Sequence, residues 1–146
     1  MNLVFAKTKD FEKILPLYQK CLDELGSATT VEEIKTEYEA VLKVGVIIFI
    51  EEDGEILGFL NGRVFTNFLD RTKQARDSYW YVKKEHRKKG VGVLILKAFE
   101  AWAKANGCST MVITPSKFGG NNPEKVKEIL EIKGYHLHGY QMRRSI

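Results

Sequence analysis

The chain has few of the features that mark secreted, membrane-spanning or disulfide-stapled proteins. Its 146 residues include only two cysteines and three prolines. Cys21 and Cys108 lie in or beside apolar segments and form no Cys-x-x-C motif, which favours two packed thiols in a reducing compartment. The longest apolar run, residues 46–50, is far shorter than the roughly 20 residues of a membrane-spanning helix. We therefore expect no membrane span and no disulfide framework.

No export signal is visible, because Lys7, Lys9 and Asp10 stand where a secretory signal needs its apolar stretch. The composition, 44% hydrophobic and 29% charged, is that of an ordinary globular protein. Internal repeats and linker-like tracts are absent from the sequence, and this length buries enough surface to need no stabilising metal. We expect one domain, residues 1–146, in the cytoplasm and without a metal site.

Positive charge is concentrated in one short segment. Residues 83–97 contain six bases and one acid, a net charge of +5, whereas the other 17 bases and 18 acids sum to −1. A compact cluster suits the few phosphates of one small ligand better than the long track of a nucleic acid. The overall charge of +4 therefore points to a local anion site.

Hydrophobic periodicity predicts a mixed α/β fold. A capping box, Thr30-x-x-Glu33, opens the second helix, and Asp53-Gly54 forms a two-residue hairpin turn. Asn122 and Pro123 are typical of the N-cap and first residue of the last helix. The predicted strands are residues 2–7, 46–50, 56–65, 76–82 and 111–114, with a last strand or hairpin over residues 135–143. The predicted helices begin near residues 11, 31, 91 and 123.

The segment that carries chemistry runs from a predicted strand through a basic loop into a helix. A helix N-terminus exposes unpaired N–H groups and a partial positive charge, which together bind phosphate. Gly90 and Gly92 leave room for an anion to approach the backbone. The loop has neither the third glycine of a dinucleotide-binding motif nor the Gly-Lys-Ser/Thr of a P-loop. We expect a phosphate site at the start of this helix.

This loop resembles the acyl-CoA loop of the GNAT acetyltransferase superfamily, which reads Gln or Arg, two residues, Gly, one residue, Gly or Ala. Arg87, Gly90 and Gly92 match each specified position, and Val82 lies five residues before Arg87, as the family's strand-ending valine does. The hairpin at residues 52–58 and the closing Lys133-Gly134-Tyr135 also resemble family landmarks. The resemblance implies a GNAT-like, mostly antiparallel mixed sheet with helices on both faces.

The resemblance also implies a reaction: an amine attacks the thioester of acetyl-CoA, the co-substrate. The loop backbone then holds the pyrophosphate, with Lys83, Lys84 or Lys97 near the 3′-phosphate. The backbone of Tyr81 and Val82 pairs with the pantetheine chain, and an N–H at Val82 stabilises the oxyanion. The residues implied in acetyl-CoA binding are Tyr81, Val82, Arg87, Lys88, Lys89, Gly90, Val91, Gly92, Val93 and Asn122.

The acid and base are less well defined. Many family members carry a tyrosine as general acid in the last helix, but here the matching position is Leu130. Tyr140 is our candidate acid, while Tyr79, Tyr81, Tyr135 or water are alternatives. Asp77 is the candidate general base, because some family members have a catalytic carboxylate at this position. The alternative is that Asp77 is a polar residue at the end of a strand that faces solvent.

The sequence is compatible with more than one interpretation of several residues and of the function. Helix capping explains Asn122, and the resemblance also implies its contact with acetyl-CoA; both roles are compatible, and Asn121 is the alternative contact if the register is shifted by one residue. His136 and His138 alternate on one predicted strand but have no third ligand for a metal. The acceptor is a small-molecule or peptide amine of unknown identity, and a homodimer fits the habit of the family. The alternatives in function are a CoA-binding module without transferase activity and a basic nucleic-acid-binding domain, the latter disfavoured by the confined charge.

Overall fold

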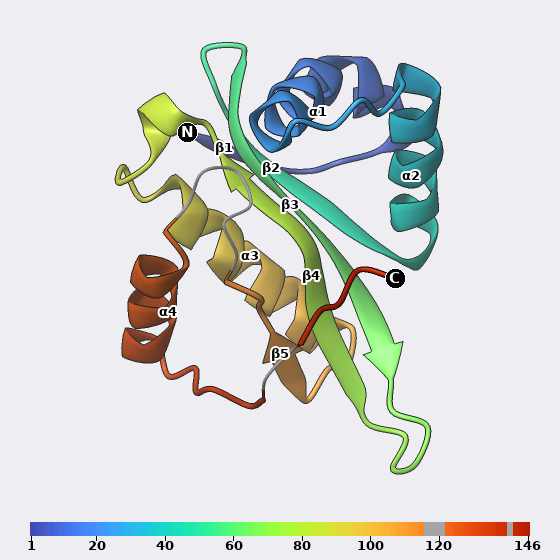
Figure 1. Cartoon of the computed structure of the whole chain (residues 1–146), viewed down its shortest axis with the longest axis vertical. Helices are drawn as coiled ribbons and strands as arrows, with labels where there is room; N and C mark the ends of the chain where they lie inside the picture. Colours follow the sequence, from blue (N-terminus) through green and yellow to red (C-terminus); the bar gives the residue numbers. More distant parts are fainter. Residues whose placement is uncertain (116–121, 140–141) are drawn as a thin grey trace.

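The structure is a computed structural model that describes residues 1–115, 122–139 and 142–146 (Figure 1). Its centre is a five-stranded sheet in which each strand lies beside its neighbours in sequence, in the order β1-β2-β3-β4-β5. The first four strands pair antiparallel and β5 pairs parallel with β4. The strands are β1 (Asn2–Phe5), β2 (Gly45–Glu52), β3 (Glu55–Thr66), β4 (Lys73–Val82) and β5 (Thr110–Val112).

Helices cover both faces of this sheet. The α1 (Phe11–Leu25) and α2 (Val31–Val44) helices pack on one face, and α3 (Val91–Ala105) packs on the other. The last helix, α4 (Pro123–Ile132), lies on the α3 side in Figure 1. Short 3-10 turns precede α1 (Thr8–Asp10) and follow β4 (Lys84–His86). The mixed, mostly antiparallel sheet with helices on both faces is confirmed.

Two hydrophobic cores lie on opposite sides of the sheet. Ile47 and Phe49 face α1 and α2, whereas Ile48 and Ile50 face α3. This alternation follows from the two-residue period of a strand. The continuously apolar run in β2 is therefore a strand buried on both faces, as its sequence predicts.

Local signals in the sequence are confirmed where they concern one element. The Thr30 side chain accepts from the Glu33 backbone while Glu33 accepts from the Thr30 N–H, which completes the capping box. Asp53 and Gly54 both have positive φ, as a primed hairpin turn requires. Asn122 accepts from the Glu124 N–H and caps α4.

The strand or hairpin predicted over residues 135–143 is wrong for the described part of that range. Residues 135–139 and 142–143 have no strand pairing. Instead, Tyr135 and His138 line a hollow of about 470 Å³ together with the second half of α3 and with β5. Strand β5 is only three residues long, so few of its backbone groups could pair with a further strand. Among the helices in the described part, none is long and apolar enough to cross a membrane.

Candidate active site

The feature that defines the candidate site is a separation of two neighbouring strands. Strand β4 pairs with β5 only at three positions, of which Arg76–Val112 is the last. From Asp77 to Val82, β4 keeps β3 on one side and has no described strand on the other. Figure 1 shows β4 continuing past the end of β5 toward the start of α3. Backbone N–H and C=O groups along this stretch of edge are therefore available to an extended ligand.

A β-bulge lies at the start of this stretch. Asn61 and Gly62 of β3 pair with Tyr79 and Asp77, so Ser78 is an additional residue in β4. A bulge shifts the side-chain alternation of the strand that carries it. After the bulge, β4 turns Tyr81 toward α1 and α2, and Trp80 and Val82 toward α3. Asn61 is buried and accepts a hydrogen bond from the Tyr18 hydroxyl at 3.0 Å.

The N-terminus of α3 lies beyond the end of β4. Gly90 has φ +80°, and no atom of the described residues lies within 4 Å of a Cβ built there, so the left-handed backbone and not crowding requires glycine. The first helical hydrogen bond runs from the Leu94 N–H to the Gly90 carbonyl at 3.0 Å. The N–H groups of Val91, Gly92 and Val93 therefore precede the first intrahelical donor, and they are suited to an anion.

Close packing between α3 and β4 is a second reason for glycine at position 92, in addition to access of an anion to the backbone. A Cβ at this position would lie 3.1 Å from the Trp80 indole. The missing side chain therefore lets α3 pack closely on β4. The Trp80 Nε1 atom is buried and has no hydrogen-bond partner among the described residues. This close contact depends on β4 and α3 together and had no separate signal in the sequence.

Arg87 connects the start of the loop to β4 and to α1. Its Nε donates to the Val82 carbonyl at 2.8 Å, and its Nη2 pairs with Glu24 Oε2 of α1 at 3.0 Å. The guanidinium also lies over the Tyr81 ring, 5.6 Å from its centroid. The Tyr81 hydroxyl donates to Glu24 Oε1 at 2.6 Å. Sequence reasoning missed Glu24, which lies 63 residues from Arg87.

This network fixes the environment of Tyr81. Its side chain is fully buried, and burial, followed by the hydrogen bond to Glu24, raises the pKa of its hydroxyl. The hydroxyl that donates to Glu24 is already engaged. The Lys83 N–H donates to the Leu57 carbonyl of β3, so the alternation of an antiparallel ladder also directs the Tyr81 backbone to β3 and leaves the backbone of Trp80 and Val82 at the open edge.

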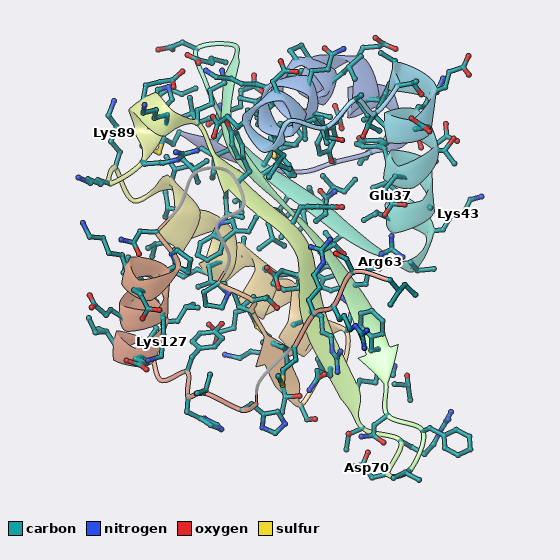
Figure 2. All side chains as sticks on the ribbon, viewed as in Figure 1. Glu37, Lys43, Arg63, Asp70, Lys89 and Lys127 are labelled. Atoms are coloured by element: carbon teal, nitrogen blue, oxygen red, sulfur yellow. The ribbon has the colours of Figure 1, made fainter. Side chains whose placement is uncertain are left out.

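The basic residues of the loop divide into paired and unpaired groups. Lys83 pairs with Glu55 Oε1 at 2.6 Å, so its charge is compensated. Lys88 and Lys89 are exposed, and neither has an ion pair within the described ranges. Figure 2 shows Lys89 on the loop, directed away from the body of the protein. The positive charge nearest the start of α3 is therefore available to a ligand.

Asp77 lies where β4 and β5 begin to separate. Its Oδ1 accepts from the backbone N–H of Thr114 at 3.0 Å, which ties β4 to the chain after β5. Burial raises the pKa of its carboxyl from 3.8 to about 6, although the hydrogen bond from Thr114 acts in the opposite direction. A carboxyl with this pKa is mostly ionised at neutral pH and can accept a proton.

The candidate proton donors differ in surroundings. Tyr79 is 40% exposed. Tyr135 is half-buried, and burial, followed by the charges of Glu100 and Asp77, raises the pKa of its hydroxyl to about 12. Tyr140 lies outside the described residues. Leu130, at the position of the usual tyrosine, is buried at 4% exposure.

One group of potential metal ligands occurs in the described ranges. Glu55, Glu85 and His86 place ligand atoms within 4.8 Å of one another. Each carboxylate already pairs with a lysine, Glu55 with Lys83 and Glu85 with Lys20. The group is therefore explained as a surface ion-pair network. His136 and His138, whose ring centroids are 6.4 Å apart, do not belong to it.

Comparison with known proteins gives a match to one family and a relative that aligns with only part of the chain. The sequence model of the acetyltransferase (GNAT) family matches residues 11–119. Aminoglycoside N(6′)-acetyltransferase type 1 from Klebsiella aerogenes is 39% identical over 66 residues. That match covers 44% of this chain and 43% of the relative, so it spans less than half of either protein.

Solved structures match over the full length. Ribosomal-protein-alanine N-acetyltransferase from Brucella melitensis biovar Abortus 2308 superposes with a TM-score of 0.77 at 14% identity, covering all of both chains. Glucosamine-6-phosphate N-acetyltransferase from Arabidopsis thaliana gives a TM-score of 0.76 at 21% identity, covering 99% of this chain and 97% of the other. At these identities the likeness shows a shared fold.

Proposed function

The chain belongs to the GNAT acetyltransferase family, and we propose that it transfers the acetyl group of acetyl-CoA to a primary amine. The observation that carries this proposal is the opening between β4 and β5 with the N-terminus of α3 at its end. One part offers an edge for an extended chain, and the other offers three N–H groups for phosphate.

We assign the binding of acetyl-CoA to the two sides of this opening. The backbone N–H groups of Val91, Gly92 and Val93 bind the pyrophosphate, and Lys88 and Lys89 add attraction. The edge of β4 beside Tyr81, through the outward backbone groups of Trp80 and Val82, pairs with the pantetheine amides. Arg87 supports this arrangement by holding the Val82 carbonyl and Glu24. Asn122 is retained as a further contact beside its capping role.

The proposed chemistry needs a neutral amine and a stabilised oxyanion. The amine nitrogen attacks the thioester carbon, its bond to that carbon forms, and the carbonyl oxygen becomes an oxyanion near the Val82 N–H. The carbon–sulfur bond then breaks as the carbonyl re-forms. Asp77 accepts the proton of the amine by way of water, because it lies five residues before Val82 on β4, and Tyr140 protonates the leaving thiolate. The products are the acetylated amine and CoA.

The acceptor is a small-molecule or peptide amine. An aminoglycoside is one candidate, suggested by the name of the partial relative from Klebsiella aerogenes. A second function, binding of CoA without acetyl transfer, is favoured by the buried Leu130 at the position of the usual acid. The two functions differ in thiol release, which only the transferase performs.

Calorimetry with acetyl-CoA and desulfo-CoA, followed by thiol release with a pool of amines, tests the proposal. We expect micromolar binding and amine-dependent release. Lys88→Glu with Lys89→Glu should weaken acetyl-CoA binding at least tenfold. The matched control, Lys9→Glu with Lys43→Glu, makes the same charge change at exposed sites on the α1 and α2 side. Equal binding by both double variants would overturn the phosphate assignment, and binding without release by any amine would favour the CoA-binding module.

A further inference from the structure

Two arginines lie directly opposite each other in the sheet. Arg63 of β3 and Arg76 of β4 are partners in the antiparallel register. Paired residues of antiparallel strands project to the same face. Arg63 Nη2 contacts Glu37 Oε1 of α2 at 2.5 Å, so both arginines lie on the face that α1 and α2 cover in part. Figure 2 labels Arg63 and Glu37 where α2 meets the sheet.

This part of the face is open. Phe65, two residues beyond Arg63, is 46% exposed, and Arg76 is exposed. On the opposite face, Ala75 is fully buried under the α3 core. Figure 1 shows β3 and β4 continuing past the end of α2. The arginine pair therefore lies at the border between the covered and the open sheet.

The charges at this border are not balanced. Glu37 is the only acid paired with either arginine in the described ranges. Arg76 Nε donates to Gln74 Oε1 at 2.6 Å, and its guanidinium lies over the Phe65 ring. Arg63 Nε is buried and has no acceptor in the part of the chain that the structure describes. Like charges placed directly opposite are unfavourable for the sheet, so folding alone does not explain this pair.

Guanidinium groups with unused donors match a particular chemistry. Their planar arrays of N–H donors suit carboxylate and phosphate oxygens. Phe65 holds one guanidinium plane against its ring, which reduces the freedom that an anion would have to remove. The pair thus offers a pre-arranged positive site on an otherwise open surface.

The position of the pair connects it to the proposed reaction. Arg76 is the last residue of β4 that pairs with β5, so the opening proposed for acetyl-CoA begins at the next residue. The arginines lie on the face away from α3. We propose that Arg63 and Arg76 bind the anionic group, a carboxylate or phosphate, of the amine acceptor. This inference rests on the proposed acetyl transfer, and it favours an anionic amine over an aminoglycoside, which carries amines but no carboxylate or phosphate.

The strand also limits the length of the acceptor. From Arg76 to Tyr81 and Val82, β4 advances by five or six residues, about 15–20 Å at 3.3 Å each. The arginine side chain bridges part of this distance. The acceptor must therefore carry its anion several bonds from its amine, which disfavours the shortest amino acids.

A matched series of amines tests the proposal at saturating acetyl-CoA. The probes are 6-aminohexanoate, 6-aminohexyl phosphate and the neutral 6-aminohexanol. We expect kcat/KM to be at least tenfold higher for the two anionic amines. Arg63→Gln with Arg76→Gln should reduce this ratio at least tenfold, whereas Arg71→Gln in the β3–β4 turn should preserve it. Equal kcat/KM for all three amines in the parent protein would overturn the inference, as would a preserved ratio in the double variant.

Because Arg63 pairs with Glu37, the double variant must first be checked by thermal unfolding, and Arg76→Gln alone is the second variant. A direct measurement separates this inference from the proposed function. The Nε–H resonances of Arg63 and Arg76 should shift and saturate on titration with 6-aminohexyl phosphate, while the Arg71 resonance stays fixed. Failure of acetyl-CoA to bind would defeat the proposed function alone, whereas unmoved Arg63 and Arg76 resonances would defeat the anion site.

Discussion

Replacing Asp77 with asparagine should stabilise the protein while slowing its reaction. Asparagine keeps an oxygen that can accept from the Thr114 N–H, so the tie between β4 and the chain after β5 is preserved. It removes the carboxylate that burial makes costly. A residue that is retained at a cost in stability is typical of a functional site.

The size of the gain follows from the pKa. The folded carboxyl has a pKa of about 6, against 3.8 for the free group. Its stabilising protonated form is fully populated below pH 3.8 and is lost as the pH rises through 6. At 1.36 kcal/mol per pKa unit, the ionised carboxylate costs about 3 kcal/mol at pH 7.5 and less than about 1 kcal/mol at pH 4. Asp77→Asn should recover most of this difference at pH 7.5.

Urea unfolding of parent and variant between pH 4 and pH 7.5 measures this gain. Asp70→Asn is the matched control, because hydrogen bonds from Thr72 lower the pKa of Asp70. Asp70→Asn should therefore lower the unfolding free energy at pH 7.5, whereas Asp77→Asn should raise it. If Asp77→Asn is no more stable than the parent at pH 7.5, or if its advantage does not shrink toward pH 4, the burial argument fails.

The same variant tests the role of Asp77 as base. Ionisation of a base with a pKa of about 6 should make kcat rise as the pH increases through 6. Asp77→Asn should lower kcat on the order of a hundredfold and remove this rise. An unchanged pH profile would show that Asp77 does not take the proton.

Three further expectations concern the loop and its support. Gly90→Ala places a side chain at φ +80° in open space, so urea unfolding should show a loss of about 1 kcal/mol from backbone strain, and no loss would contradict that conformation. Glu24→Gln removes the charge opposite Arg87, so the unfolding free energy of the variant should be lower than that of the parent protein. This loss of stability should be smaller in 1 M salt, and a loss that does not change with salt would argue against an ion pair. Burial raises the pKa of the Cys21 thiol to about 12, so a disulfide reagent at pH 8 should find at most one reactive thiol in the folded protein and two after unfolding. Two rapidly reacting thiols in the folded protein would refute this burial.

Sequence reasoning succeeded where neighbouring residues determine the structure. The capping box at Thr30, the turn at Asp53 and the cap at Asn122 each need only residues within a few positions, and each is confirmed. The buried strand around Ile48 is also confirmed, because an apolar run has few other solutions. The strand or hairpin predicted after Gly134 is absent from the described residues 135–139 and 142–143, because an alternating pattern does not supply a pairing partner.

The sequence alone determined the order of the elements as far as the last helix, the helix start at Val91 with its phosphate-binding potential, and the family resemblance of the loop that begins at Arg87. Only the tertiary structure decided which charges are free and which are used. It joined Arg87 to Glu24, separated β5 from β4 after Arg76, and placed Arg63 opposite Arg76. The physical reason is distance along the chain: capping and periodicity act within a few residues, whereas these ion pairs and registers join segments that meet only when the sheet and helices pack.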